Sequence, residues 1–107
     1  MPRWLSKVLT RIRALAAAHN VRFTLKALRE LAGLELGLDE EDACDVLSEL
    51  TAGDSAGRVA SAATGEWMYL FRPQVSETIL YIKVILRNDC VVVSFHEDEG
   101  GSDEDGE

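Results

Sequence analysis

The sequence contains few cysteines, and their number and spacing limit the chemistry it can support. Cys44 and Cys90 are the two cysteines among 107 residues. They lie in separate apolar segments, without the CxxC or Cys/His spacing of a zinc site and without the density of a disulfide framework. We therefore interpret both as small core residues of a protein in a reducing cytoplasm.

Long hydrophobic runs are missing as well. The longest apolar stretch, residues 79–86, is interrupted by Lys83 and is far shorter than the roughly 20 residues of a membrane-spanning helix. The first 20 residues intersperse basic and apolar side chains, whereas a signal peptide has an uninterrupted apolar block. These absences predict no membrane partner and a cytoplasmic location.

Motifs for phosphate loops, nucleophile elbows and metal loops are also absent. There is no Walker loop, GxSxG or GxGxxG, and the carboxylates near the C-terminus lack the ordered spacing of an EF-hand. We therefore expect no metal and no other cofactor.

Basic residues are absent from the last eleven positions, where seven acidic residues gather, although the chain has 11 basic residues and a net charge of −8. The remaining 12 acidic residues nearly balance the basic ones, seven of which lie within the first 29 positions. A strongly negative charge would normally argue against a nucleic-acid partner, but here it comes from one end. We predict a single folded domain over residues 1–98 and a disordered, acidic tail over residues 99–107.

The hydrophobic pattern predicts helices in the first half of the chain and strands in the second. Apolar residues recur at helical spacing over residues 8–16, after the capping residue Thr24, and after Asp39, whose partner in a capping box is Asp42. From Glu66 onward the period is two, which predicts strands near residues 67–71, 78–87 and 90–96. The fold class is α+β, with N-terminal helices packed on a twisted antiparallel sheet.

Asn88 and Asp89 suit a two-residue turn between the last two strands, because both tolerate positive φ. That turn pairs Arg87 with Cys90 and leaves one wholly apolar face, with pairs Leu86–Val91, Val84–Val93 and Ile82–Phe95. The other face then carries the pairs Ile85–Val92, Lys83–Ser94 and Tyr81–His96. This second face is either the solvated side of the sheet or a site for acid–base chemistry on a phosphodiester.

The segment LFRPQVSETILYIKVILRNDCVVVSFHEDE resembles the C-terminal half of the MqsR (motility quorum-sensing regulator) family of bacterial toxins. The Arg-Pro strand end, the LYIK strand and the final VVSF strand have the family's order and spacing. The segment VRFTLKALRELAGLELGLDEEDACDVLSEL fits the family's N-terminal half more loosely, and the likeness covers roughly residues 6–98.

The resemblance implies a RelE-like fold and the toxin half of a type II toxin–antitoxin system. Such toxins are mRNA interferases that cut mRNA without a metal, with a preference for GCU. Their antitoxin carries a zinc-binding module and a helix-turn-helix domain. The oligomeric state, including a homodimer, is left open.

The resemblance also implies roles for individual residues. Tyr81 matches a family tyrosine, His96 stands where the best-known members have lysine, and Arg58 corresponds to a loop lysine, so these three are the expected catalytic residues. Met68 replaces a glutamine and cannot form its hydrogen bonds, which argues against carrying over the GCU preference. With Met68, the expected RNA-contacting residues are Lys83, Arg72 and Ser94.

The sequence thus predicts an endoribonuclease in which the ribose 2′-OH attacks the adjacent phosphorus and leaves a cyclic phosphate. The alternative is a non-catalytic protein-binding module that retains the toxin fold. The replacement at Met68 and the acidic tail favour that alternative.

Overall fold

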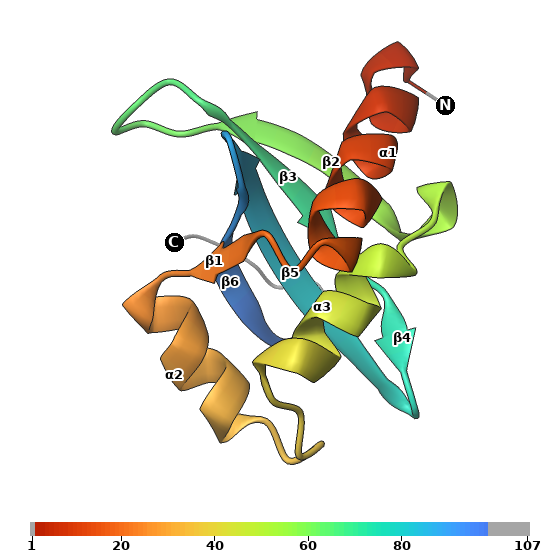
Figure 1. Cartoon of the computed structure of the whole chain (residues 1–107), viewed down its shortest axis with the longest axis vertical. Helices are drawn as coiled ribbons and strands as arrows, with labels where there is room; N and C mark the ends of the chain where they lie inside the picture. Colours follow the sequence, from red (N-terminus) through yellow and green to blue (C-terminus); the bar gives the residue numbers. More distant parts are fainter. Residues whose placement is uncertain (1, 99–107) are drawn as a thin grey trace.

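A computed structural model of the chain describes residues 2–98 and shows three helices on one sheet (Figure 1). The helices are α1 (Arg3–Ala17), α2 (Leu25–Gly33) and α3 (Glu40–Ser48), with a 3-10 turn, η1 (Ala52–Asp54). The strands are β1 (Val21–Phe23), β2 (Ser55–Ala60), β3 (Trp67–Phe71), β4 (Gln74–Val75), β5 (Thr78–Leu86) and β6 (Cys90–Glu97). The predicted α+β fold class is confirmed. The predicted tail over residues 99–107 lies outside the described residues.

The sheet is mixed, whereas the sequence predicted an antiparallel one. Its order is β1-β6-β5-β3-β2, with β4 paired to β5, and β1 runs parallel to β6. The residues between α1 and α2 were expected to connect two helices. They pair with β6 because the Cys90 N–H donates to the Asn20 carbonyl and the Thr24 N–H donates to the Val92 carbonyl. A strand of three residues is too short to show a period of two, so the hydrophobic pattern did not predict β1.

The β5–β6 hairpin differs from the prediction near its turn. The loop has three residues, because Leu86 pairs with Cys90, and the register then shifts by one between Lys83 and Val84. This β-bulge places Cys90 and Val92 in the core, where Val91 and Val93 were expected. Beyond the bulge the register is the predicted one, with Ile82 opposite Phe95, Lys83 opposite Ser94 and Tyr81 opposite His96.

The core lies between the helices and one face of the sheet (Figure 1). The apolar stripe of α1 is buried as predicted, and it packs with α3 and with the largest buried strand residues, Phe71, Phe95, Ile82 and Leu80. Both cysteines are buried free thiols, which confirms their prediction as core residues. Burial raises the pKa of the Cys90 thiol to about 12. Among the described residues, no helix is both long and apolar enough to span a bilayer.

Helix α2 is tied to β6 at the bulge through Thr24. The Thr24 hydroxyl accepts a hydrogen bond from the Ala27 N–H at 3.1 Å, as the predicted cap requires, and lies 3.4 Å from the Val93 carbonyl. Ala27 and Leu31 then bury against the core. The cap therefore determines where α2 begins and how it meets the bulged strand.

Replacing Thr24 by alanine is expected to lower the free energy of unfolding by about 1 kcal/mol, because an orphan helix N–H loses its acceptor. Urea denaturation measures the change. Thr10→Ala is the matched control, because that hydroxyl only bonds back to the Ser6 carbonyl within α1. Removing the Thr10 hydroxyl should leave the free energy of unfolding unchanged or raise it slightly. Equal midpoints for the two variants would show that the cap contributes nothing.

An ion pair between Arg87 and Glu66 joins the end of β5 to the residue just before β3. The guanidinium donates to both carboxylate oxygens, at 2.7 and 2.9 Å. These bonds lower the pKa of Glu66 from 4.5 to about 2. Because the folded pKa is depressed, the pair stabilises the fold above pH 4.5 and this contribution is lost as the pH falls toward about 2.

We expect the Glu66 carboxyl to titrate near pH 2 in an NMR titration of the folded protein. Arg87→Ala should return that midpoint to the ordinary range of a glutamate, because both charge-assisted bonds are removed. Arg87→Lys, which keeps the charge and loses the two-pronged geometry, should give an intermediate value. An ordinary midpoint in the unmodified protein would contradict the ion pair.

Candidate active site on the open face of the sheet

Within residues 2–98, the helices pack on one face of the sheet, and we call the other face the open face. Side chains alternate between faces along a strand. Since Phe71, Ile82 and Phe95 point into the core, their neighbours in β3, β5 and β6 point to the open face. These neighbours are Leu70, Tyr81, Lys83, Ser94 and His96. Ile85, two residues after Lys83, lies on the same face.

Tyr81 stands at the centre of this face. Its ring stacks on the His96 imidazole, with centroids 5.2 Å apart and planes inclined by 28°. The Lys83 ammonium lies 5.9 Å from the Tyr81 ring centroid, and the Arg72 guanidinium lies 6.0 Å from it. Four of the seven predicted site residues are therefore brought together: a phenol, an imidazole and two cations.

The backbone orients the imidazole of His96. Its Nδ1 atom lies 2.8 Å from the carbonyl oxygen of Glu97. A carbonyl oxygen can only accept, so Nδ1 carries the proton of this bond. In the neutral ring the lone pair is then on Nε2. The ring can accept a proton there, and it can donate one from the same atom once it is protonated.

Arg72 is restrained by an acidic partner. Its Nε atom lies 3.7 Å from the Asp98 carboxylate, and 46% of the side chain remains exposed. Because this contact is long and partly solvated, it is worth little energetically. The guanidinium keeps donors for another anion, which makes Arg72 suitable for contact with a phosphate group.

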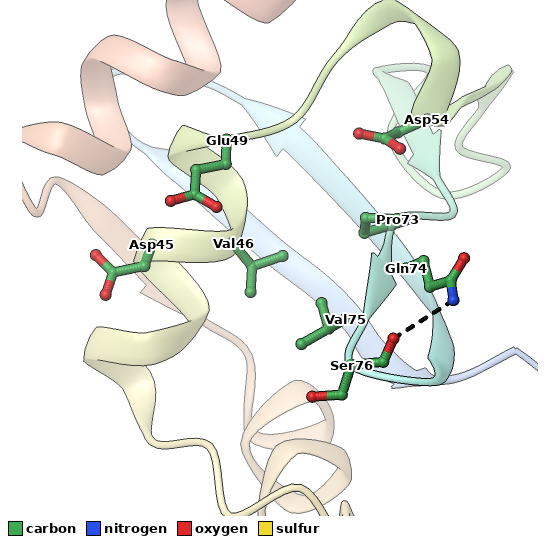
Figure 2. Close-up of a pocket in the computed structure, with 8 residues that line it drawn as sticks. All are labelled: Asp45, Val46, Glu49, Asp54, Pro73, Gln74, Val75 and Ser76. Carbon is green, nitrogen blue, oxygen red and sulfur yellow. Dashed lines mark hydrogen bonds between the residues drawn. The ribbon is translucent and has the colours of Figure 1, made fainter.

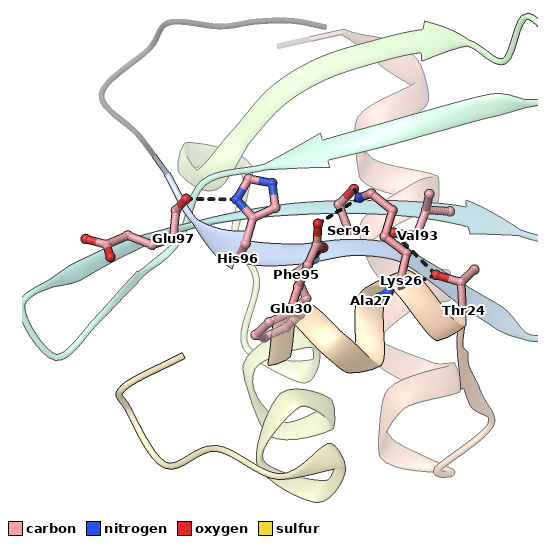
Figure 3. A network of polar contacts seen from close by, with 9 residues as sticks. All are labelled: Thr24, Lys26, Ala27, Glu30, Val93, Ser94, Phe95, His96 and Glu97. Atoms are coloured by element: carbon pink, nitrogen blue, oxygen red, sulfur yellow. Dashed lines mark hydrogen bonds and ion pairs between the residues drawn. The ribbon is translucent and has the colours of Figure 1, made fainter. Parts of the chain in front are cut away.

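Ser94 is 2% exposed and lies under the Lys26 side chain. The Lys26 ammonium donates to the Ser94 hydroxyl at 2.8 Å and pairs with Glu30 at 2.9 Å, as the polar network of Figure 3 shows. Ser94 is therefore buried beneath Lys26, and its contact with RNA stays a prediction. No sequence motif singled out Lys26, because its only local signal is the i,i+4 spacing to Glu30.

Met68 also belongs to the open face, two residues before Leu70 on β3. It pairs with Val59 of β2 and is partly buried. Its thioether can make apolar contacts with a flat ligand such as a base. It supplies no amide hydrogen bond at this position.

Arg58 lies on the opposite face from the Tyr81–His96 pair. It pairs with Tyr69, which packs against the core, and its guanidinium lies between two indoles, 4.8 Å from the Trp4 ring centroid and 3.9 Å from that of Trp67. Trp4 belongs to α1, so Arg58 joins that helix to the β2–β3 hairpin. The structure does not bring Arg58 together with the other expected catalytic residues.

A separate pocket of about 340 Å³ lies between α3 and β4 (Figure 2). Three carboxylates line it, from Asp45, Glu49 and Asp54. These groups repel a phosphodiester, so this pocket is a poor candidate for an RNA site. Within residues 2–98, no three carboxylate, histidine or cysteine side chains are grouped so that they could hold a metal ion.

Fold and open face together define a small α+β protein whose sheet carries a cationic site with titratable groups. Comparison with known proteins identifies the family to which this chain belongs. The family model described as "Motility quorum-sensing regulator, toxin of MqsA" matches residues 6–97. The chain is 31% identical over 90 residues to the mRNA interferase toxin MqsR of Escherichia coli (strain K12), covering 83% of this chain and 90% of that protein. The chain belongs to the MqsR toxin family, and its architecture is consistent with the RelE-like fold.

Arg58→Ala is expected to lower the free energy of unfolding by about 1–2 kcal/mol, because two cation–π contacts of roughly 0.5–1 kcal/mol each are lost. Both tryptophans of the chain flank this guanidinium. Their fluorescence should therefore change in the folded state. Arg29→Ala, an exposed arginine of α2, is the control and should change neither quantity. Unaltered emission from the Arg58→Ala variant would contradict the stacked arrangement.

Proposed function

We propose that this protein is a metal-independent endoribonuclease that cuts mRNA in the cytoplasm, as the toxin of a toxin–antitoxin pair. Membership of the MqsR family and the name of its Escherichia coli relative support an mRNA target. The single observation that carries the proposal is the stack of Tyr81 on His96, with Lys83 and Arg72 beside it. Such a group combines proton transfer with stabilisation of negative charge.

In the proposed reaction the ribose 2′-oxygen forms a bond to the adjacent phosphorus, and the bond from phosphorus to the 5′-oxygen breaks. One product ends in a 2′,3′-cyclic phosphate and the other begins with a 5′-hydroxyl group. A base takes the proton of the 2′-OH, and an acid gives a proton to the departing oxygen. His96 performs one of these transfers through Nε2, and Tyr81 orients the phosphate or relays the second proton.

The cations of the open face stabilise the negative charge that develops on the phosphate oxygens. Lys83 supplies a compact charge, and Arg72 supplies a planar fork that fits a phosphate group. Met68 offers an apolar surface to a base in place of an amide, so we assign no GCU preference. Arg58 could reach RNA only from the opposite face, and we assign it no step in the reaction.

We further propose an antitoxin partner, because the family is described as the toxin of MqsA. The resemblance implies that this partner carries a zinc-binding module and a helix-turn-helix domain. The alternative function is a protein-binding module without catalysis. Met68 supports this alternative, because it lacks the amide of the glutamine that it replaces. If the alternative holds, expression of the protein without its partner should be harmless.

His96→Asn is expected to slow cleavage of a single-stranded RNA by about 10²–10⁴-fold, because a positioned proton-transfer group is lost. Tyr81→Phe should also slow it, since the hydroxyl is removed and the ring stays. Gel electrophoresis measures the rate, and mass spectrometry identifies the cyclic phosphate. A chelator should leave the rate of the unmodified protein unchanged.

His19→Asn is the matched control for this experiment. The chain has two histidines, and His19 is the one outside the proposed site. Its side chain is exposed just after α1. Its φ of 57° is a backbone conformation that asparagine tolerates. The control should cleave at the normal rate and arrest growth when expressed. A His96→Asn variant that cleaves as fast as the control would refute the proposed site, and harmless expression of the unmodified protein would favour the binding module.

A further inference from the structure

The edge of β6 carries a polar network that the proposed reaction does not use. β1 pairs with β6 only as far as Val92, so within residues 2–98 no strand lies along this edge of β6 beyond the bulge. The first turns of α2 lie along this segment (Figure 3). The Phe95 N–H, which would otherwise be a free edge donor, donates to Oε1 of Glu30 at 2.9 Å. The Glu30 carboxylate thus accepts the hydrogen bond that a neighbouring strand would otherwise accept.

The same carboxylate directs Lys26 around the strand edge. Oε2 of Glu30 pairs with the Lys26 ammonium at 2.9 Å, while Oε1 is held by the backbone of β6. The ammonium also donates to the Ser94 hydroxyl at 2.8 Å. Lys26 starts from a helix on the core side of the sheet and ends beside an open-face residue, as Figure 3 shows.

This position is next to the proposed site. Ser94 lies opposite Lys83, and it precedes His96 by two residues on the same face of β6. Residues two apart on a strand are separated by about 6.6 Å. An RNA strand whose reacting phosphate lies at His96 would therefore bring a neighbouring phosphate close to Lys26.

The Lys26 ammonium retains a donor for that phosphate. It has three N–H groups, and the structure uses one for Glu30 and one for Ser94. Its side chain is 59% exposed, in contrast to 22% for Glu30. The carboxylate is therefore turned toward the protein, and the cation toward the solvent.

We propose that Lys26 is a substrate-binding residue that holds an RNA phosphate adjacent to the one that reacts, with Glu30 and Ser94 as its positioning residues. This inference rests on the proposed function, because it takes the Tyr81–His96 pair as the point of cleavage. The competing explanation is an ion pair that only closes the edge of β6. The two explanations differ in how RNA binding depends on salt, because each phosphate contact releases bound counterions.

The experiment measures the binding of a 2′-O-methylated single-stranded RNA, which lacks the attacking hydroxyl, by fluorescence anisotropy over a series of salt concentrations. Lys26→Ala should weaken binding about tenfold at low salt and reduce the slope of log K against log salt by about 0.7. Lys26→Arg should restore the slope. Lys7→Ala, the same change on the exposed side of α1, should leave affinity and slope unchanged.

Glu30→Gln should change the affinity for RNA in the opposite direction to Lys26→Ala. The amide oxygen can still accept from Phe95, and the Ser94 hydroxyl still accepts from Lys26. Because the negative charge beside Lys26 is gone, RNA should bind more tightly. If the ion pair only closes the strand edge, Lys26→Ala and Glu30→Gln will both lower the melting temperature without changing the slope. That result overturns the inference.

Cleavage of unmodified RNA separates this inference from the proposed function. If the unmodified protein cleaves and the Lys26→Ala slope is unchanged, the inference alone is wrong. If binding depends on Lys26 but no cleavage occurs, the phosphate contact stands and the nuclease proposal fails. If the unmodified protein neither binds nor cleaves RNA, both are wrong.

Discussion

The pairing of β5 with β6 determines where every central side chain of the candidate site lies. Tyr81 and Lys83 come from one strand and His96 from the other, and the hairpin register makes Tyr81 and His96 direct neighbours. A slip of one residue would send one of the two rings to the core. The site therefore depends on the bulge at Val93, because it reconciles the three-residue turn with this register.

The three helices give the two faces of the sheet different chemistry. They cover one face with apolar side chains, and α3 brings acidic groups to the pocket beside β4. Phosphate would be repelled there. The open face carries Lys83 and Arg72, together with Lys26 from α2. The protein is acidic in total, yet the face that we propose for RNA holds cations around its aromatic pair.

The Tyr81–His96 pair could be predicted although the turn itself was predicted wrongly. A two-residue turn without a bulge and a three-residue turn with one bulge give the same register beyond Lys83. The alternation of apolar residues in β5 and β6 favoured that register, since a shift by one residue would put Ile82 and Phe95 on opposite sides. Near the turn, where Val84 meets Val92, the alternation failed because the bulge interrupts it.

The helices, the main strands, the capping of α2 and α3, and the family could all be predicted from the amino-acid sequence, because these depend on local spacing and on collinear motifs. The three-dimensional arrangement was needed to show that Arg58 lies between Trp4 and Trp67 and that Lys26 reaches the open face. The same holds for the position of β1 beside β6. Each of these contacts joins segments far apart in the chain, and local periodicity carries no information about which distant groups a packed core brings together.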